Sequence, residues 1–399
     1  MSSILKNRRI LLCISSGIAI YKTVGLVSIL RKSGADIRIV LTSNAKKMVS
    51  EMVFSAVGNC PVYSEMFDVI DGWIPHTDLS NWAELLVVAP ATANSIAKIN
   101  HGIADNLLLT TCLAHKRKKM IVPTMNIRMY EDITTQQNLK DLQEKNWEVL
   151  EPDFGYLACG DIGPGRYPEN EVILQNIEYL LAEKLLEDFD VLVTAGPTRE
   201  KIDNVRYITN RSSGKMGYAM ARAFRYAGSN VNLISGPTDI EPPAGIKVTK
   251  VESTEEMGNS VDSLAKYADI ILMTAAVSDY FQKNPVSYKI KKTEEKLVVE
   301  LTRTRDIIST MKRKKGSVLI GFCAEDKEIE KRAHQKLMNK DLDIVFANDI
   351  SKEEIGFDSE YNELLMLAKD GTKVLFPRLP KEELSLKVVK QIANYIKNS

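Results

Sequence analysis

Short apolar runs alternate with helical patterns along most of the chain, and this alternation restricts the folds that the chain can adopt. Ile10–Ile14 is followed by a helical pattern over Ala19–Lys32 and then by a second apolar run, Ile37–Leu41. Leu85–Ala89 and Met120–Pro123 continue the series. Strands that are each followed by a helix form a parallel sheet, and ligands bind at the carboxyl ends of such strands. The polar turns after these runs are therefore the first candidates for a binding site.

The alternation lapses once and then starts again, which predicts two domains. Residues 151–170 are rich in glycine and proline, so we expect an ordered loop, or flap, in this range. Helices over Lys46–Val57 and Val172–Leu186 belong to the first series. The second series contains the runs Val191–Ala195, Val231–Ser235, Val248–Val251, Ile270–Thr274, Val318–Phe322 and Ile344–Ala347, a hairpin of Leu364–Ala368 with Val374–Phe376 around an Asp-Gly turn, and a final helix over Lys381–Lys397. We expect an α/β fold of two consecutive Rossmann-like domains, residues 1–187 and 188–399, each a mostly parallel sheet flanked by helices.

The composition excludes several classes of protein. Lys and Arg number 53 against 52 Asp and Glu, so no overall field would attract nucleic acid or an anionic membrane. The five cysteines are scattered and form no C-x-x-C, which argues against a disulfide framework and a structural zinc site. The N-terminus runs into a strand without a signal-peptide pattern. We expect a cytoplasmic protein without nucleic-acid or membrane partners.

Two turns have the composition of an anion site. Asn210–Gly217, which reads NRSSGKMG, directly precedes a helix, where backbone N–H groups and the helix dipole favour negative charge. An ordinary capped loop is the alternative, and we prefer that alternative for Gly196-Pro197 taken alone. The segment is not a Walker A loop, because Met216 stands where Ser or Thr would bind magnesium. The second turn, Ser15–Ala19, lacks the G-x-G-x-x-G fingerprint of dinucleotide sites.

Few side chains stand out as candidates for catalysis. His76 lies between aromatic and apolar residues, where an imidazole acts either as a base near neutral pH or as a structural group. The histidines at 101, 115 and 334 lie in polar contexts, and we expect them on the surface. Cys159, in the glycine-rich flap, is a candidate acid or nucleophile. Lys289–Lys292 has alternate lysines that a strand would place on one face, although a solvated edge strand is the common alternative.

The motifs resemble a known family in combination. In the first domain they are Ser16–Lys22, His76, Pro90–Asn94, Pro123–Met129 and Leu157–Arg166, and in the second Ala195–Thr198, Asn210–Gly217, Ala275–Tyr280, Lys289–Lys292 and Gly321-Phe322. This set resembles the bifunctional phosphopantothenoylcysteine decarboxylase/phosphopantothenate–cysteine ligase family of coenzyme A biosynthesis. The chain departs from the family pattern at Tyr130, where Trp is usual, at Asn106, where Asp is usual, and at Ser278, where Ala is usual. These exchanges bear on substrate fit more than on the chemistry.

For the first domain, the resemblance implies a flavodoxin-like decarboxylase that converts phosphopantothenoylcysteine to 4′-phosphopantetheine with FMN. His76 would serve as the base, Asn126 would hold the departing carboxylate, and Cys159 would deliver the last proton. The FMN residues implied by the resemblance are Ser16, Gly17, Ile18, Ser43, Thr92 and Asn94.

For the second domain, the resemblance implies a ligase that joins cysteine to 4′-phosphopantothenate through an acyl-cytidylate made from CTP. Asn210 would bind the acyl group, and Lys289 would offset charge on the triphosphate. The implied CTP residues are Ala275, Asp279, Lys289, Arg305, Asp306, Ile307, Ile308, Phe322, Lys336 and Lys340. Mg²⁺ is expected with CTP, with protein ligands that the sequence does not identify, and the resemblance implies a homo-oligomer through both domains.

Three other functions remain as alternatives. A flavin-dependent peptidyl-cysteine decarboxylase would not need Asn210 or Lys289. A non-catalytic binding protein on the same fold would lack His76 or Cys159, and both are present. A nicotinamide-dependent reductase is weakened by the missing glycine fingerprint.

Overall fold

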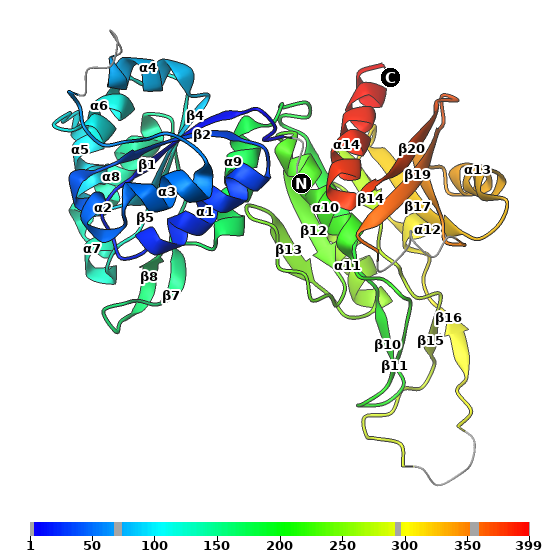
Figure 1. Cartoon of the computed structure of the whole chain (residues 1–399). Helices are drawn as coiled ribbons and strands as arrows, with labels where there is room; N and C mark the ends of the chain where they lie inside the picture. Colours follow the sequence, from blue (N-terminus) through cyan, green and yellow to red (C-terminus); the bar gives the residue numbers. More distant parts are fainter. Residues whose placement is uncertain (1–3, 68–73, 292–296, 352–358, 399) are drawn as a thin grey trace. The chain divides into compact units, whose positions relative to one another are not determined.

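Contacts divide the chain into two units, Met1–Ala182 and Glu183–Ser399, and each is described by itself (Figure 1). The computed structural model describes residues 4–67, 74–291, 297–351 and 359–398. Within these ranges no helix combines the length and the apolar character needed to cross a bilayer.

The first unit is built on a six-stranded sheet in which every neighbouring pair is parallel. Its order is β3-β2-β1-β4-β5-β6, formed by β1 (Arg9–Ile14), β2 (Asp36–Leu41), β3 (Val62–Tyr63), β4 (Leu85–Ala91), β5 (Lys118–Pro123) and β6 (Trp147–Val149). Ile10, Leu12 and Ile14 of β1 face one hydrophobic core, whereas Leu11 and Cys13 face another. Successive residues of a strand point to opposite faces, so an unbroken apolar run marks a strand that is covered on both sides.

Helices cover both faces of this sheet. On one side lie α1 (Ile20–Lys32), α3 (Glu51–Gly58) and α9 (Asn170–Leu181), and on the other α4 (Pro75–Trp82), α5 (Ala93–His101), α6 (Leu107–Ala114) and α8 (Ile133–Glu144), with the short α2 (Ser43–Met48) and α7 (Ile127–Glu131) after β2 and β5. The prediction of one continuous helix over 46–57 is wrong. It divides into α2 and α3 because Ser50 has extended backbone and its side chain accepts the Met52 N–H. The helix predicted to reach Leu186 ends at Leu181, since Ala182 is extended.

The flap predicted as a loop contains a hairpin of β7 (Asp153–Tyr156) with β8 (Ile162–Arg166). Two glycines allow β8 to lie against the connection between β5 and α7. A Cβ on Gly165 would lie 2.3 Å from the Met125 carbonyl oxygen, and one on Gly163 would lie 2.1 Å from Ile127 Cδ1. The glycine content of this segment therefore reflects close packing as well as turns.

The second unit contains an eight-stranded sheet of order β13-β12-β9-β14-β17-β18-β19-β20. Its strands are β9 (Asp190–Ala195), β12 (Asn230–Ser235), β13 (Lys247–Lys250), β14 (Ile270–Met273), β17 (Val318–Glu325), β18 (Ile344–Asp349), β19 (Tyr361–Ala368) and β20 (Lys373–Pro380). Pairs are parallel as far as β18, and β19 and β20 form the antiparallel hairpin that the Asp-Gly turn predicted. One face is covered by α10 (Lys215–Tyr226) and α14 (Lys381–Asn398), the other by α11 (Thr254–Leu264), α12 (Ile307–Thr310) and α13 (Ile329–Asn339). Two mainly parallel sheets, each flanked by helices, confirm the predicted α/β fold class.

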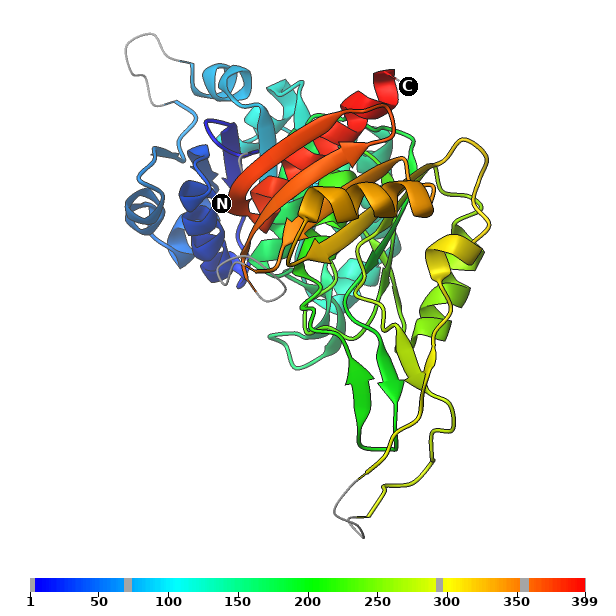
Figure 2. The ribbon, with the colours of Figure 1, turned by 90° about the vertical axis from the view of Figure 1, so that its right-hand side faces the viewer.

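Two small hairpins extend from this second sheet as arms (Figures 1 and 2). One pairs β10 (Arg199–Lys201) with β11 (Tyr207–Thr209), and the other pairs β15 (Tyr280–Gln282) with β16 (Leu301–Arg303). The sequence did not predict these arms. Lys289, Ile290 and Lys291 belong to the second arm but lie outside any strand, and Lys292 lies outside the described residues.

Candidate active sites

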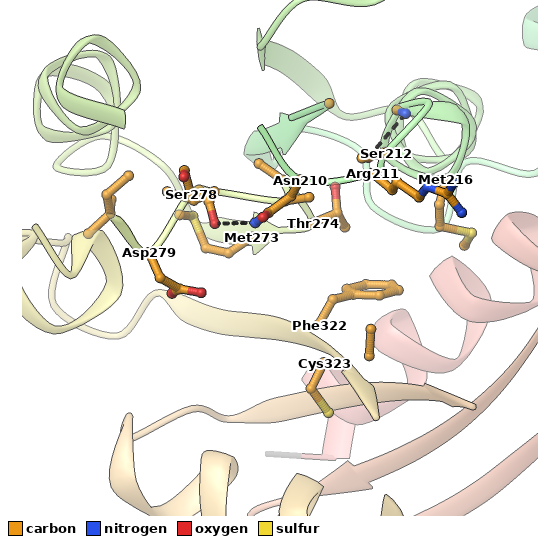
Figure 3. Close-up of a pocket in the computed structure, with 18 of the residues that line it drawn as sticks. Asn210, Arg211, Ser212, Met216, Met273, Thr274, Ser278, Asp279, Phe322 and Cys323 are labelled. Carbon is orange, nitrogen blue, oxygen red and sulfur yellow. Dashed lines mark hydrogen bonds between the residues drawn. The ribbon is translucent and has the colours of Figure 1, made fainter. Parts of the chain in front are cut away.

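A cavity of about 920 Å³ lies at the carboxyl ends of strands in the second sheet. Its walls come from the segment before α10, the segment after β14, the start of α12, the end of β17 and α13 (Figure 3). Lys289 does not line it, but every other residue implied for the acyl and CTP sites does: Asn210, Ala275, Asp279, Arg305, Asp306, Ile307, Ile308, Phe322, Lys336 and Lys340.

The segment Asn210–Gly217 gives the cavity a wall of backbone and positive charge. Gly214, with φ of 77°, precedes α10, and the helix begins without a side-chain cap. Gly217 brings the first turn of α10 against β9, since a Cβ there would lie 2.5 Å from Ala195 Cβ. Lys215 forms an ion pair with Glu360. The positive end of a twelve-residue helix therefore lies at the cavity wall, as an anion site requires.

The loop Ala275–Asp279 rests on a buried polar network. Ser278 N–H donates to Thr198 Oγ1 at 2.9 Å, and Thr198 Oγ1 lies 3.0 Å from Thr254 Oγ1. Thr254 donates both its N–H and its hydroxyl to Glu200 Oε1, at 2.8 and 2.7 Å. The Ser278 hydroxyl donates to the Tyr280 carbonyl, so the serine that replaces the family's alanine serves this loop. Such a network fixes the backbone that carries Asp279.

Asn210, which also lines the cavity, is hydrogen-bonded to this loop. Its Nδ2 donates to the Val277 carbonyl at 2.8 Å (Figure 3). Its amide oxygen takes no part in that bond, so it can accept a further hydrogen bond from the same rotamer. Asp279 is exposed and faces the same cavity from the end of the loop.

The opposite wall carries two lysines with fixed ammonium groups. Lys336 Nζ donates to the Phe322 carbonyl at 2.6 Å. Lys340 pairs with Asp306, which also caps α12 by accepting the Ser309 N–H at 3.2 Å. Burial raises the pKa of Asp306, but Lys340 and the Ser309 N–H outweigh it and leave the pKa below its usual value. The carboxylate therefore stays ionised and holds Lys340 beside the helix start.

Arg305 is also fixed before any ligand binds. Its guanidinium pairs with Asp262 at 2.7 Å, and its Nε donates to Thr310 Oγ1 at 2.6 Å. The hydrogen bond to Asp262 raises the pKa of Arg305. Several lining residues were not individually predicted: Asn348 lies next to the last residue of β18, Asn362 lies in β19 and Lys381 begins α14. The rule that ligands bind at strand ends gives a signal for Asn348 alone.

In the first unit, the residues implied for FMN lie at the carboxyl ends of three adjacent strands, β2, β1 and β4. Ser15 joins two of these ends, because its hydroxyl donates to the Pro90 carbonyl at 2.8 Å and accepts the Thr92 N–H at 3.0 Å. Helix α1 begins without a side-chain cap, whereas Thr92 caps α5. The turns that contain Ser16, Gly17, Ile18, Ser43, Thr92 and Asn94 thus share one edge of the sheet.

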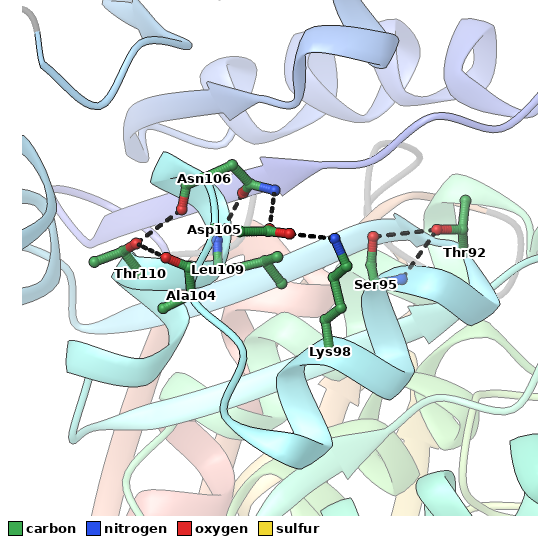
Figure 4. A network of polar contacts seen from close by, with 8 residues as sticks. All are labelled: Thr92, Ser95, Lys98, Ala104, Asp105, Asn106, Leu109 and Thr110. Atoms are coloured by element: carbon green, nitrogen blue, oxygen red, sulfur yellow. Dashed lines mark hydrogen bonds and ion pairs between the residues drawn. The ribbon is translucent and has the colours of Figure 1, made fainter.

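A polar network fixes the helix that follows Thr92 (Figure 4). Thr92 Oγ1 lies 3.1 Å from Ser95 Oγ. Lys98 of α5 forms an ion pair with Asp105, which lies between α5 and α6. Asn106 caps α6 by accepting the Leu109 N–H at 3.0 Å. An amide oxygen caps a helix as a carboxylate does, so asparagine preserves the structure here without the charge of the family's aspartate.

The flap brings two predicted catalytic residues together. Asn126 Nδ2 lies 3.1 Å from Cys159 Sγ, and its Oδ1 caps α7 by accepting the Arg128 N–H at 2.8 Å. Cys159 is exposed in the turn between β7 and β8. His76 lies in the first turn of α4, and its Nδ1 is buried without a hydrogen-bond partner in the ranges that the structure describes. No hydrogen bond between described residues joins His76 to the other two.

One expectation about histidines is wrong. His115 is 1% exposed, although it was expected on the surface. Its Nδ1 lies 2.9 Å from the Ser80 carbonyl oxygen and its Nε2 3.2 Å from that of Lys118. Burial lowers the pKa of His115. His101 and His334 are exposed, as predicted.

The metal ligands remain unassigned. Among the described residues, no group of three or more His, Cys, Asp or Glu side chains is arranged to hold a metal ion.

Comparisons with known proteins agree across nearly the whole chain. Residues 1–182 match the family described as Flavoprotein, and residues 186–396 match the family described as DNA/pantothenate metabolism flavoprotein C-terminal domain. The "Coenzyme A biosynthesis bifunctional protein CoaBC" of Bacillus subtilis is 41% identical over 395 residues, covering 98% of this chain and 97% of that protein. The protein of the same name from Escherichia coli K12 is 38% identical over 378 residues, covering 93% of each chain.

A crystal structure of the C-terminal domain of a bifunctional protein CoaBC is also similar. It is 38% identical, with a TM-score of 0.47 over 54% of this chain and 100% of that one. The sequence relatives and the two family matches confirm the resemblance carried by the motifs. The chain belongs to the family of bifunctional coenzyme A biosynthesis proteins, with a flavoprotein domain followed by a pantothenate-metabolism C-terminal domain.

Proposed function

We propose that the chain catalyses two successive steps of coenzyme A biosynthesis. Residues 188–399 join cysteine to 4′-phosphopantothenate with CTP, and residues 1–187 decarboxylate the product to 4′-phosphopantetheine with FMN. The observation that carries the proposal is that one cavity is lined by nearly all of the residues implied for acyl and nucleotide binding.

In the ligase step, Asn210 orients the carboxylate of 4′-phosphopantothenate by hydrogen bonds. The carboxylate attacks the α-phosphorus of CTP, and pyrophosphate leaves as the acyl-cytidylate forms. The cysteine amine then attacks the acyl carbon and displaces CMP. The start of α10 and the ammonium groups of Lys336 and Lys340 stabilise the phosphates, because all of them lie on the walls of the same cavity.

Lys289 offsets the charge that develops on the triphosphate, and Mg²⁺ accompanies CTP. Lys289 lies outside the cavity of its own unit, so it must reach the nucleotide through movement of its arm or from a second copy. We favour a second copy and a homo-oligomer. Exposed apolar side chains on the arms support this: Val205, Tyr207, Tyr280, Tyr288, Leu297, Val298 and Leu301.

The first unit has features that suit FMN. A Cβ on Gly17 would come no closer than 4.0 Å to the nearest protein atoms, Pro90 Cγ and Thr92 Cγ2, so packing does not require glycine there. A phosphate that approaches the backbone would require it, and the uncapped start of α1 provides the N–H groups. The buried Nδ1 of His76, without a partner among the described residues, also indicates a group that a ligand completes. Ser16, Gly17, Ile18, Ser43, Thr92 and Asn94 would hold the cofactor.

Bound FMN would supply oxidation and later reduction of the carbon that carries the thiol. The protein's own residues handle protons and charge. His76 accepts the proton removed from the substrate, and the Asn126 amide holds the carboxylate until it departs. Cys159 delivers the final proton, and its contact with the Asn126 amide supports this role.

The proposal extends to a cytoplasmic location. All five cysteines are free, which suits a reducing compartment.

Purified protein tests both halves of the proposal. It should be yellow with a flavin spectrum, and with CTP, Mg²⁺, cysteine and 4′-phosphopantothenate it should release pyrophosphate and carbon dioxide. Substituting ATP for CTP should abolish most of the pyrophosphate release. A colourless protein would contradict the decarboxylase assignment, and a yellow protein without CTP-dependent pyrophosphate release would contradict the ligase assignment.

A further inference from the structure

The two arms of the second unit are joined close to Lys289. The turn of the first arm, residues 202–206, lies beside residues 286–290 of the second, and the arms run side by side in both views (Figures 1 and 2). Val286 N–H donates to the Ile202 carbonyl at 3.4 Å, and Asn204 Nδ2 donates to the Ser287 carbonyl. The segment that carries Lys289 is therefore tied to the neighbouring arm at several points.

The centre of this junction is the carboxylate of Asp203. Its side chain is 0% exposed, although it lies in the turn of a projecting hairpin. Oδ1 accepts the N–H groups of Val205 and Arg206, each at 2.7 Å. Oδ2 accepts from Arg206 Nη1 at 3.0 Å and from the Ile290 N–H at 3.2 Å. One oxygen thus closes the turn of its own arm, and the other reaches the second arm.

Closing the turn does not require both carboxylate oxygens of Asp203. A turn of this kind is closed by a single side-chain oxygen, as asparagine or serine also provides. Burying a carboxylate is costly unless its oxygens are satisfied by donors. Here burial raises the pKa of Asp203, but the N–H groups of Val205, Arg206 and Ile290 outweigh it and keep the pKa below its usual value. The second oxygen accepts from the Arg206 guanidinium of its own arm and from the Ile290 N–H of the arm that carries Lys289.

We propose that Asp203 is a positioning residue for Lys289. Its bond to the Ile290 N–H fixes the backbone next to Lys289 and so determines where the ammonium group can meet the triphosphate. This inference rests on the role proposed above for Lys289 in the ligase step. A catalytic charge misplaced by about 1 Å can lower a rate about 10²-fold. Asp203 itself lies outside the cavity and need not touch the substrate.

The test uses Asp203→Asn in the full-length protein with FMN, CTP and Mg²⁺. The asparagine oxygen can still close the turn, but its NH₂ group would face two donors, the Ile290 N–H and the Arg206 guanidinium. We expect faster hydrogen exchange in residues 286–290 and a kcat for pyrophosphate release lower by about 10- to 100-fold. The KM for CTP should change less than about threefold, because the interaction is made in the transition state.

Asp203→Ser is a second variant. Its hydroxyl oxygen can close the turn, but it has no second oxygen for the Ile290 N–H, so we expect the same changes in hydrogen exchange and kcat as in Asp203→Asn. Asp370→Asn is the matched control. Asp370 also accepts a backbone N–H in a hairpin turn, from Thr372 at 2.8 Å, but it does not line the cavity. It should leave exchange in 286–290 and kcat unchanged. Calorimetric binding of CTP should persist in every variant and shows that the second unit, which carries these substitutions, has folded.

A double-mutant cycle distinguishes positioning from a merely structural role. In a Lys289→Gln background, Asp203→Asn should lower kcat by less than about twofold further, because its effect passes through Lys289. An equal fall in both backgrounds, or unchanged exchange in 286–290, would overturn the proposal. So would full activity of Lys289→Gln. Failure of the proposed function would be seen earlier, as wild-type protein that releases no pyrophosphate with CTP.

Discussion

Replacing Gly217 by alanine tests how α10 is held against the second sheet. A Cβ at this position would lie 2.5 Å from Ala195 Cβ, 3.1 Å from Ala195 Cα and 2.7 Å from Thr274 Oγ1. Carbon atoms in contact lie about 3.5–4.0 Å apart, so the start of the helix must move by about 1 Å. Two of the three atoms belong to a buried strand and cannot rotate away.

Overpacking of this kind costs about 1–3 kcal/mol, against a gain of about 1 kcal/mol when alanine replaces glycine in a helix. We expect the free energy of unfolding to fall by about 1–2 kcal/mol, because the clash is with the backbone and Cβ of the strand. For a unit of this size the melting temperature should fall by about 2–8 °C.

Gly258→Ala in α11 is the control, measured by calorimetry beside Gly217→Ala. Its Cβ would meet Arg305 Nη1 at 3.3 Å, and a shift of that side-chain end by a few tenths of an ångström would relieve the contact. Helix propensity should therefore prevail and raise the stability of the same unit by up to about 1 kcal/mol. The packing argument is refuted if Gly217→Ala melts at or above the wild type, or if both variants shift the transition in the same direction.

Three further predictions concern single side chains. Cys159→Ser should still release carbon dioxide but fail to accumulate phosphopantetheine, because a hydroxyl is a far weaker acid than a thiol; full conversion would remove Cys159 from the mechanism. Asn210→Asp should abolish pyrophosphate release while calorimetry still detects CTP binding, because Asn210 is assigned to the acyl group. Lys289→Gln, which removes a charge assigned to the triphosphate, should slow release about 10²- to 10³-fold. Loss of CTP binding in Asn210→Asp would contradict the assignment of Asn210 to the acyl group. The pKa of His115 is lowered on folding, so the unfolded chain binds the proton more tightly, and stability should fall as the pH drops below about 6.5. Unfolding free energies across this range would show it, and the same fall in a His115→Gln variant would contradict it.

The two sheets could be predicted because their strands are buried on both faces. Leu85–Ala89, for example, is entirely buried and reads as an unbroken apolar run. The position of the cavity followed from the strand-end rule, and its wall at Asn210–Gly217 followed from a polar segment that precedes a helix. The other implied residues followed from the family resemblance. The arms could not be predicted, because β10 and β16 are three-residue strands with mostly exposed or charged side chains.

Other misses depended on contacts between distant parts of the chain. His115 precedes the charged run Lys116–Lys119, which indicates a surface, but its ring turns inward to the carbonyl of Ser80. The contact between Asn126 and Cys159 likewise depends on glycines of β8 that let the flap lie against the end of β5. Local sequence patterns carry no information about either arrangement.

The outermost strands of the second sheet, β13 and β20, bear on how the protein behaves when crowded. An unpaired strand edge recruits strands from other chains, and this is how many proteins aggregate. Pro377 and Pro380 deprive β20 of two N–H donors, while exposed Lys247 and Lys250 stand at either end of β13. Proline and lysine are the residues that block such recruitment. Addition of a strand from another molecule is therefore disfavoured at both edges of this sheet. The folded protein should resist aggregation through these edges even at high concentration.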